Sequence, residues 1–71
     1  MAKYILNANA QSTGEHEVHN ANTCYWLPEQ HNRIDLGEHS TCQSAVLEAK
    51  RRFQQSKIDG CAHCSPSCHT R

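Results

Sequence analysis

The sequence predicts a small α+β domain with two or three short antiparallel strands, one helix and a C-terminal Cys/His knuckle. The chain has 71 residues, of which 37% are hydrophobic and 6% aromatic, so its core must be thin. Short alternating segments precede one helical pattern, and no repeat or domain boundary interrupts them. We therefore treat residues 1–71 as a single small domain, with residues 60–71 as a Cys/His-rich tail.

Three segments have the apolar alternation that is typical of short strands. The first covers residues 3–9, and the polar stretch of residues 9–14, which ends in glycine, predicts a turn after it. Ile5 is an exception in this segment, because it places an apolar side chain on the otherwise polar face. Residues 15–19 can return as a weaker second strand, and residues 33–37 form the third candidate.

The helix is the best-defined element in the sequence. Ser40 is a favourable N-cap residue, and Gln43 three positions later completes a capping box. The helix is expected to end over residues 56–60, where Gly60 can adopt the positive φ of a helix stop. One face is apolar, with a stripe made of Cys42, Ala45, Val46, Ala49 and Phe53.

Charge and hydropathy exclude several classes of protein. Lys plus Arg number 7 and Asp plus Glu number 7, so the chain lacks the basic excess of most nucleic-acid-binding modules. No apolar run approaches the roughly 20 residues that span a bilayer. The N-terminal residues lack the apolar stretch of a secretory signal. We therefore expect a cytoplasmic protein without a membrane partner, whose cysteines stay reduced and favour metal over disulfides.

Five Cys and six His are the obvious source of additional stability in so small a chain. Cys61 and Cys64 form a C-x-x-C, a spacing at which two thiolates can hold one tetrahedral ion. His19 and Cys24 form a second pair, because a strand end and the following turn can bring both side chains to one side. The sequence therefore predicts a Zn²⁺ site made of His19, Cys24, Cys61 and Cys64.

Other roles for the remaining cysteines and histidines stay open. Cys68 and His69 closely follow the C-x-x-C and are the first alternatives for a ligand position, the reserve ligands. Cys42 lies on the apolar stripe of the helix and fits a buried core thiol better than a ligand. Disulfide pairing is another alternative, although an odd number of cysteines cannot all pair within one chain. Ordinary surface or packed positions are expected for His16, His31, His39 and His63.

Three further patterns could indicate other chemistry. A C-x-x-C can be a redox couple, but such a pair normally opens a helix, whereas Cys61 and Cys64 follow one. The Glu- and His-rich residues 15–19 do not match H-E-x-x-H, because their two histidines are only three positions apart. The one basic cluster is expected to be a solvated helix face, and it consists of Lys50, Arg51 and Arg52, with Lys57 beyond.

The arrangement of the proposed ligands resembles the zinc-binding domain of the bacterial Ada-type methylphosphotriester DNA-repair proteins. The residues that carry this resemblance are Val18-His19, Cys24, Ala45 and Ala49 in the helix, and Cys61-x-x-Cys64. The resemblance implies a zinc site formed by the same four ligands. His19 stands where the repair domain has a Cys, and the stretch between Cys24 and Cys61 is longer here, so methyl-transfer chemistry is not expected.

More of the chain resembles a group of short, uncharacterised bacterial Cys/His-rich proteins, and this second resemblance implies no function. The strings that carry it are residues 14–19, Leu27-Pro28, Leu36-Gly37, Ala45-Val46, Ala49-Lys50, Gly60-Cys61 and Cys68-His69-Thr70.

From these observations we expect a structural zinc-binding module without catalytic residues, acting as an interaction or adaptor protein with an unknown protein partner in a bacterial cytoplasm. Three alternatives belong to other classes. One is a thiol–disulfide redox protein that uses Cys61 and Cys64. The second is a nucleic-acid-binding module that uses the basic helix face. The third is an exported peptide held together by disulfides.

Overall fold

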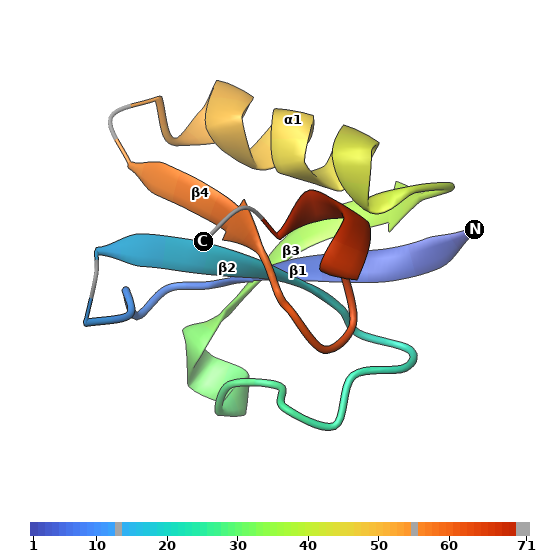
Figure 1. The fold of residues 1–71 in the computed structure, drawn as a ribbon, viewed down its shortest axis with the longest axis horizontal. Coiled ribbons are helices and arrows are strands. Elements are labelled where there is room, and N and C mark those ends of the chain that lie inside the picture. The colour runs from blue at the N-terminus through green and yellow to red at the C-terminus, as the bar shows by residue number, and fades with distance from the viewer. Residues whose placement is uncertain (13, 55, 70–71) are drawn as a thin grey trace.

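The computed structural model describes residues 1–12, 14–54 and 56–69, and its fold is α+β, as the sequence predicts. Within these residues, one helix lies across one face of a four-stranded sheet (Figure 1). None of the described helices is long and apolar enough to cross a membrane. In chain order the elements are β1 (Ala2–Asn7), β2 (Glu15–Asn20), η1 (Gln30–Asn32), β3 (Arg33–His39), α1 (Cys42–Arg52), β4 (Lys57–Gly60) and η2 (Pro66–Cys68), where η denotes a 3₁₀ turn.

The sheet is mixed and has the strand order β3-β1-β2-β4. β1 pairs antiparallel with both β2 and β3, whereas β4 adds to β2 in parallel. The β1–β3 register shifts between Tyr4 and Ile5, and Gly37 lies opposite Tyr4 at this irregularity with a φ of 85°. Glycine adopts such a φ without steric cost, which explains why the strand can bulge at this position.

All three strands predicted from the sequence are present, although their ends differ. β1 ends at Asn7 rather than Asn9, because the Asn7 side chain turns the chain by accepting a hydrogen bond of 2.9 Å from the Asn9 N–H. The predicted turn that follows includes Thr13, which lies outside the described residues. Gly14 has a φ of 92°, and its N–H donates to the Gln11 carbonyl at 2.8 Å, as a turn there requires.

The apolar stripe of α1 packs on the sheet and forms the core. Cys42, Ala45 and Ala49 are buried, and Val46 and Phe53 pack against the same cluster. The sheet contributes Tyr4 and Leu6 from β1, Val18 from β2 and Leu36 from β3. The small residues on the helix let its backbone approach the sheet closely.

The opposite face of the sheet is also covered, which explains the position of Ile5. Side chains alternate along a strand, so Val18 points to the helix and His19 to the other face. Ile5 is the antiparallel partner of His19 and is only 5% exposed. The loops after β2 and β4 lie on the side of the sheet away from α1 (Figure 1).

The helix begins one residue later than the sequence predicts. Its N-cap is Thr41, whose Oγ1 accepts a hydrogen bond of 3.4 Å from the Ser44 N–H. The predicted capping box of Ser40 and Gln43 is therefore wrong. Ser and Thr are both good N-cap residues, and the extended backbone at Thr41 decides between them.

The two adjacent hydroxyl residues allow a direct test of this cap. Thr41→Ala should lower the free energy of unfolding by about 1 kcal/mol, because it leaves an N–H of the first helical turn without its partner. Ser40→Ala is the matched control and should change stability by less than about 0.5 kcal/mol. Urea unfolding followed by circular dichroism measures both. Equal losses in the two variants would contradict the assignment.

The sequence-based end of the helix is also wrong. α1 ends at Arg52, and the N–H of Phe53 at its C-cap donates to the Ala49 carbonyl at 2.9 Å. Lys57–Gly60, expected to finish the helix, instead forms β4 beside β2. Gly60 is not among the positive-φ glycines of the described residues. Its role is steric, because a Cβ at this position would lie 2.5 Å from the Cys68 Cβ.

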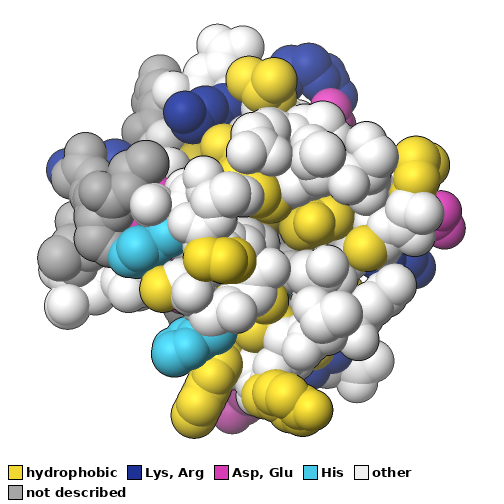
Figure 2. All heavy atoms as spheres, turned by 45° about the vertical axis from the view of Figure 1, so that its right-hand side comes forward, with side chains coloured by type: hydrophobic (Ala, Val, Ile, Leu, Met, Phe, Trp, Pro, Cys, Tyr) yellow, Lys and Arg dark blue, Asp and Glu magenta, His cyan; other side chains and the backbone are white. Residues whose placement is uncertain are grey.

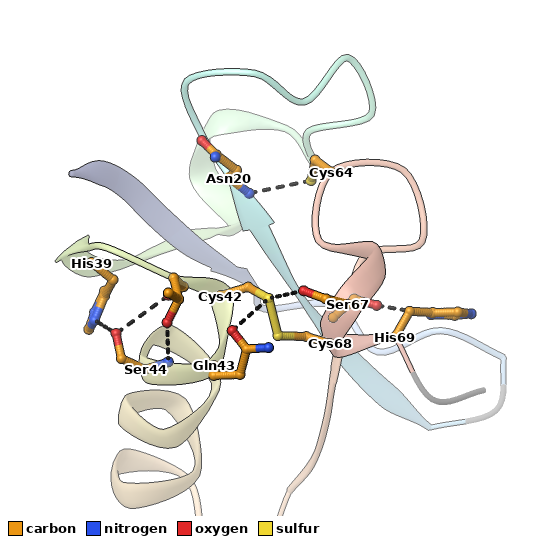
Figure 3. The surroundings of a disulfide bond; sticks show 11 residues. Asn20, His39, Cys42, Gln43, Ser44, Cys64, Ser67, Cys68 and His69 are labelled. Atoms are coloured by element: carbon orange, nitrogen blue, oxygen red, sulfur yellow. Dashed lines mark hydrogen bonds between the residues drawn. A yellow bond between two sulfur atoms is a disulfide. The ribbon is translucent and has the colours of Figure 1, made fainter.

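Cys42 and Cys68 form a disulfide between the first turn of α1 and η2 (Figure 3). The expectation that all cysteines stay reduced is therefore wrong for this pair. Cys42 does belong to the core, as predicted, but as half of a disulfide rather than as a thiol. The bond fixes the C-terminal segment over the end of β4, where Cys68 contacts Gly60.

Loss of this disulfide should weaken the fold measurably. The bond joins residues separated by 26 positions, for which the loss of chain entropy predicts a stabilisation of about 3.5 kcal/mol. We expect the double variant Cys42→Ser/Cys68→Ser to be less stable than the oxidised wild type by that amount in metal-containing buffer. A strong reductant should lower the stability of the wild type and so remove most of its difference in unfolding free energy from the double variant. Equal stability of the two oxidised proteins would show that the bond does not form or does not contribute.

Candidate metal centre

The pairing of β2 with β4 brings the first two candidate ligands together. Val18 is the parallel partner of Gly60, and the Cys61 N–H donates to the Val18 carbonyl at 3.0 Å. The next residues along both strands are His19 and Cys61. They lie side by side at the same end of the sheet, and both are buried, at 2% and 1% exposure.

A tight turn after each strand supplies the other two candidates. The Asn20 carbonyl accepts hydrogen bonds from the N–H groups of Thr23 at 3.2 Å and Cys24 at 3.0 Å, so the chain folds back toward His19. After β4, the Cys61 carbonyl accepts a hydrogen bond of 2.8 Å from the Ser65 N–H, which closes a turn around Cys64. The two turns lie against each other, and the Asn20 N–H donates to Cys64 Sγ at 3.3 Å (Figure 3).

The structure thus gathers all four residues that the sequence singled out. One ligand atom from each of His19, Cys24, Cys61 and Cys64 lies within 4.8 Å of every other, and the set could hold a metal ion. His19 Nδ1 is 3.5 Å from Cys24 Sγ and 3.7 Å from Cys64 Sγ. Cys24 Sγ is 3.9 Å from Cys61 Sγ. His19, Cys24 and Cys61 are buried, and Cys64 is half-buried.

Burial controls the protonation of these groups. It lowers the pKa of the His19 imidazole, and the nearby His63 lowers it further. Burial raises the pKa of both Cys61 and Cys64, although backbone N–H groups directed at the sulfurs oppose the shift. At neutral pH the imidazole is therefore neutral, as a metal ligand must be. A bound cation would overcome the burial of the thiols and favour their thiolate forms.

Glu17 lies on the outer side of the His19 ring. Its Oε1 is 3.8 Å from His19 Nε2, while Nδ1 of the same ring faces the sulfurs. A carboxylate behind a ligating imidazole commonly orients the ring and fixes its tautomer. The Glu- and His-rich segment of β2 therefore contributes one candidate ligand and one side chain that can orient it.

The reserve ligands lie outside this cluster. Cys68 is bonded to Cys42, so neither sulfur can bind a metal in this state. The side chain of His69 is directed elsewhere, because its Nδ1 lies 3.0 Å from the Gly60 carbonyl oxygen and 3.3 Å from Asp59 Oδ2.

The four histidines that the sequence assigns to ordinary positions also lie outside the ligand set. His16 Nδ1 is 2.9 Å from the Asn7 carbonyl oxygen, and His39 bridges Ser44 Oγ and the Leu36 carbonyl. His31 is exposed beside Glu29. His63 contacts the ring of Trp26, an arrangement that the sequence did not indicate.

Two members of the basic cluster on α1 pair with one acidic side chain. Glu48 accepts hydrogen bonds from Arg51 at 3.1 and 2.7 Å and also pairs with Arg52. These hydrogen bonds, first from Arg51 and then from Arg52, lower the pKa of Glu48 to about 2. At neutral pH Glu48 therefore offsets part of the positive charge of this part of α1.

Comparison with family models, with curated proteins and with solved structures found no match to this chain.

Substitution of single ligands tests the composition of the cluster. Addition of Co²⁺ to the reduced wild type should give the visible absorption of a tetrahedral sulfur-rich site. His19→Ala, Cys24→Ser, Cys61→Ser or Cys64→Ser should weaken binding by more than the roughly 10- to 100-fold that loss of an outer partner costs. His69→Ala is the matched control and should keep the wild-type spectrum. If any of the four variants keeps the full wild-type absorption, the substituted residue is not a metal ligand.

Proposed function

We propose that this protein is a structural zinc-binding module in which one Zn²⁺ ion is held by His19, Cys24, Cys61 and Cys64. The observation that carries the proposal is the convergence within 4.8 Å of three sulfurs and one imidazole nitrogen, from the ends of β2 and β4 and from the turn that follows each strand. Three thiolates and one imidazole are a common ligand set of structural zinc sites.

The distances support a tetrahedral ion. Zinc–sulfur bonds of about 2.3 Å place two sulfurs about 3.8 Å apart, and zinc–nitrogen bonds of about 2.1 Å place a sulfur and a nitrogen about 3.6 Å apart. Three of the six pairs of ligand atoms, at 3.5, 3.7 and 3.9 Å, are close to these separations, and all six are within 4.8 Å. A tetrahedral centre therefore requires the four ligand atoms to move together by about 1 Å at most in their mutual separations.

Four protein ligands favour a structural rather than a catalytic role. Catalytic zinc usually keeps one position open for water or substrate, whereas a complete set of Cys and His ligands closes the site. The ion would join the turn after β2 to the turn after β4 on the face of the sheet opposite α1. In a chain with only four aromatic residues, such a link supplies cohesion that the core lacks.

Two alternative functions have weaker support. A redox-active C-x-x-C needs a thiol whose pKa is lowered, but burial raises the pKa of Cys61 and Cys64. A nucleic-acid-binding module usually carries a basic excess, but the chain has none, and Glu48 pairs with two of the four cations of the cluster, Arg51 and Arg52. We therefore prefer an interaction or adaptor role with a protein partner. A bacterial source and a cytoplasmic location are predictions from the sequence alone, and the Cys42–Cys68 disulfide is of a kind that is rare in the cytosol.

Removal of the metal should unfold the domain. Structural zinc contributes on the order of 10 kcal/mol to folding, more than the net stability of most small domains. Excess EDTA under reducing conditions should therefore collapse the dispersed amide signals in the ¹⁵N–¹H NMR spectrum, and added Zn²⁺ should restore them. An unchanged native spectrum in the metal-free protein would contradict the proposal.

A further inference from the structure

Two of the four aromatic side chains of this protein are exposed rather than packed in its thin core. Trp26 is the only Trp and Tyr25 one of two Tyr, yet they are 63% and 97% exposed. Trp and Tyr are the residue types most enriched at the energetic centres of protein interfaces. Their exposure in a domain with a thin core makes this part of the surface a candidate contact site.

The exposed aromatics lie directly beside the proposed metal centre. Trp26 follows Cys24 by two positions, and its ring lies 5.1 Å from the ring of His63, centroid to centroid, with an angle of 39° between them. His63 stands between Cys61 and Cys64. One member of this ring pair thus comes from each of the turns that the ion would join. Figure 2 shows hydrophobic and His side chains together at the lower edge of the molecule, where Figure 1 places these turns.

We call the surface formed by Tyr25, Trp26 and His63 the aromatic platform. Because the Trp26–His63 contact connects the two turns, the ion that holds them together would also hold the platform in shape. The platform is thus expected to exist only in the metal-loaded protein.

The charge around the aromatic platform indicates what it can bind. Residues 21–32 and 61–69 together contain one Asp, Glu, Lys or Arg side chain, Glu29, which is exposed. A zinc ion with three thiolates and a neutral imidazole adds one further negative charge. Among the cations at the border, Arg33 donates through Nε to the Pro28 carbonyl at 2.8 Å, and Lys3 is exposed on β1. These two cations offset Glu29 and the acidic side chain of Glu17, which lies 3.8 Å from His19. The charge of the metal–thiolate centre therefore leaves the metal-loaded surface weakly negative, which favours a cationic partner over an anionic one.

We propose that the aromatic platform docks a Lys- or Arg-bearing segment of a partner protein. The cation of that segment would lie over the face of Trp26, the aromatic ring that attracts cations most strongly, with Glu29 and the metal–thiolate centre adding electrostatic attraction. Tyr25 would cover the apolar part of the segment. This inference rests on the proposed zinc centre, because the ion holds the two halves of the platform together.

Titration of zinc-loaded protein with short peptides tests this assignment. The probes are an acetylated and amidated peptide of alternating Arg and Leu, the same peptide with Glu in place of Arg, and single-stranded oligothymidine. We expect only the Arg peptide to quench the fluorescence of Trp26 and to shift the NMR signals of the Trp26 indole and the His63 amide. Comparable or tighter binding of the Glu peptide or of oligothymidine would overturn the charge assignment.

Two variants locate the binding surface. Trp26→Ala should weaken binding of the Arg peptide at least tenfold, measured by NMR titration, while zinc stoichiometry stays at the wild-type value. Leu47→Ala is the matched control, since Leu47 is also an exposed apolar side chain, at 67%, but lies on α1. It should bind the peptide as the wild type does. Undiminished binding by Trp26→Ala would overturn the proposal.

Metal analysis of the same samples separates this inference from the proposed function. A wild type that binds zinc but not the Arg peptide would overturn the docking site and leave the zinc module intact. A wild type that folds without zinc and still binds the Arg peptide would overturn both the zinc module and the metal dependence of the platform.

Discussion

The parallel pairing of β2 with β4 is the constraint on which the candidate site depends. Residues 18 and 60 are far apart in sequence, yet their alignment makes His19 and Cys61 neighbours at the same end of the sheet. Each strand then enters a tight turn that returns a cysteine to the same point. Because pairing with β1 also holds β2, a shift of one residue in this register would displace β4 and move Cys61 away from His19.

Two cross-links of different kinds act on the C-terminal segment. Residues 61–69 have little regular structure of their own, with η2 as their only described element. The Cys42–Cys68 disulfide attaches this segment to α1, and the candidate metal ligands attach its beginning to the turn after β2. A thin core, with small residues on the helix face, leaves this segment few apolar contacts to hold it. The concentration of Cys and His in the last third of the chain therefore has a structural explanation.

Local patterns in the sequence were sufficient to predict some features of the structure and insufficient to predict others. The apolar stripe of α1 and the antiparallel strands follow from periodicity, and the four candidate ligands follow from motif spacing. β4 could not be predicted in this way, because Lys57–Gly60 has one strongly apolar residue, Ile58, and ends in a glycine that also fits a helix stop. Its strand conformation depends on pairing with β2, a non-local contact.

The disulfide likewise depends on tertiary proximity, since sequence spacing does not determine which cysteines pair. The choice of Thr41 over Ser40 as N-cap depends on backbone geometry.

Native mass spectrometry of the purified protein, before and after chelation and alkylation, tests the central claim most directly. The account predicts one zinc ion per chain, a mass reduced by one disulfide, and three cysteines that become alkylated only after the metal is removed. A metal-free folded chain, or one in which Cys24, Cys61 or Cys64 takes part in a disulfide, would contradict it.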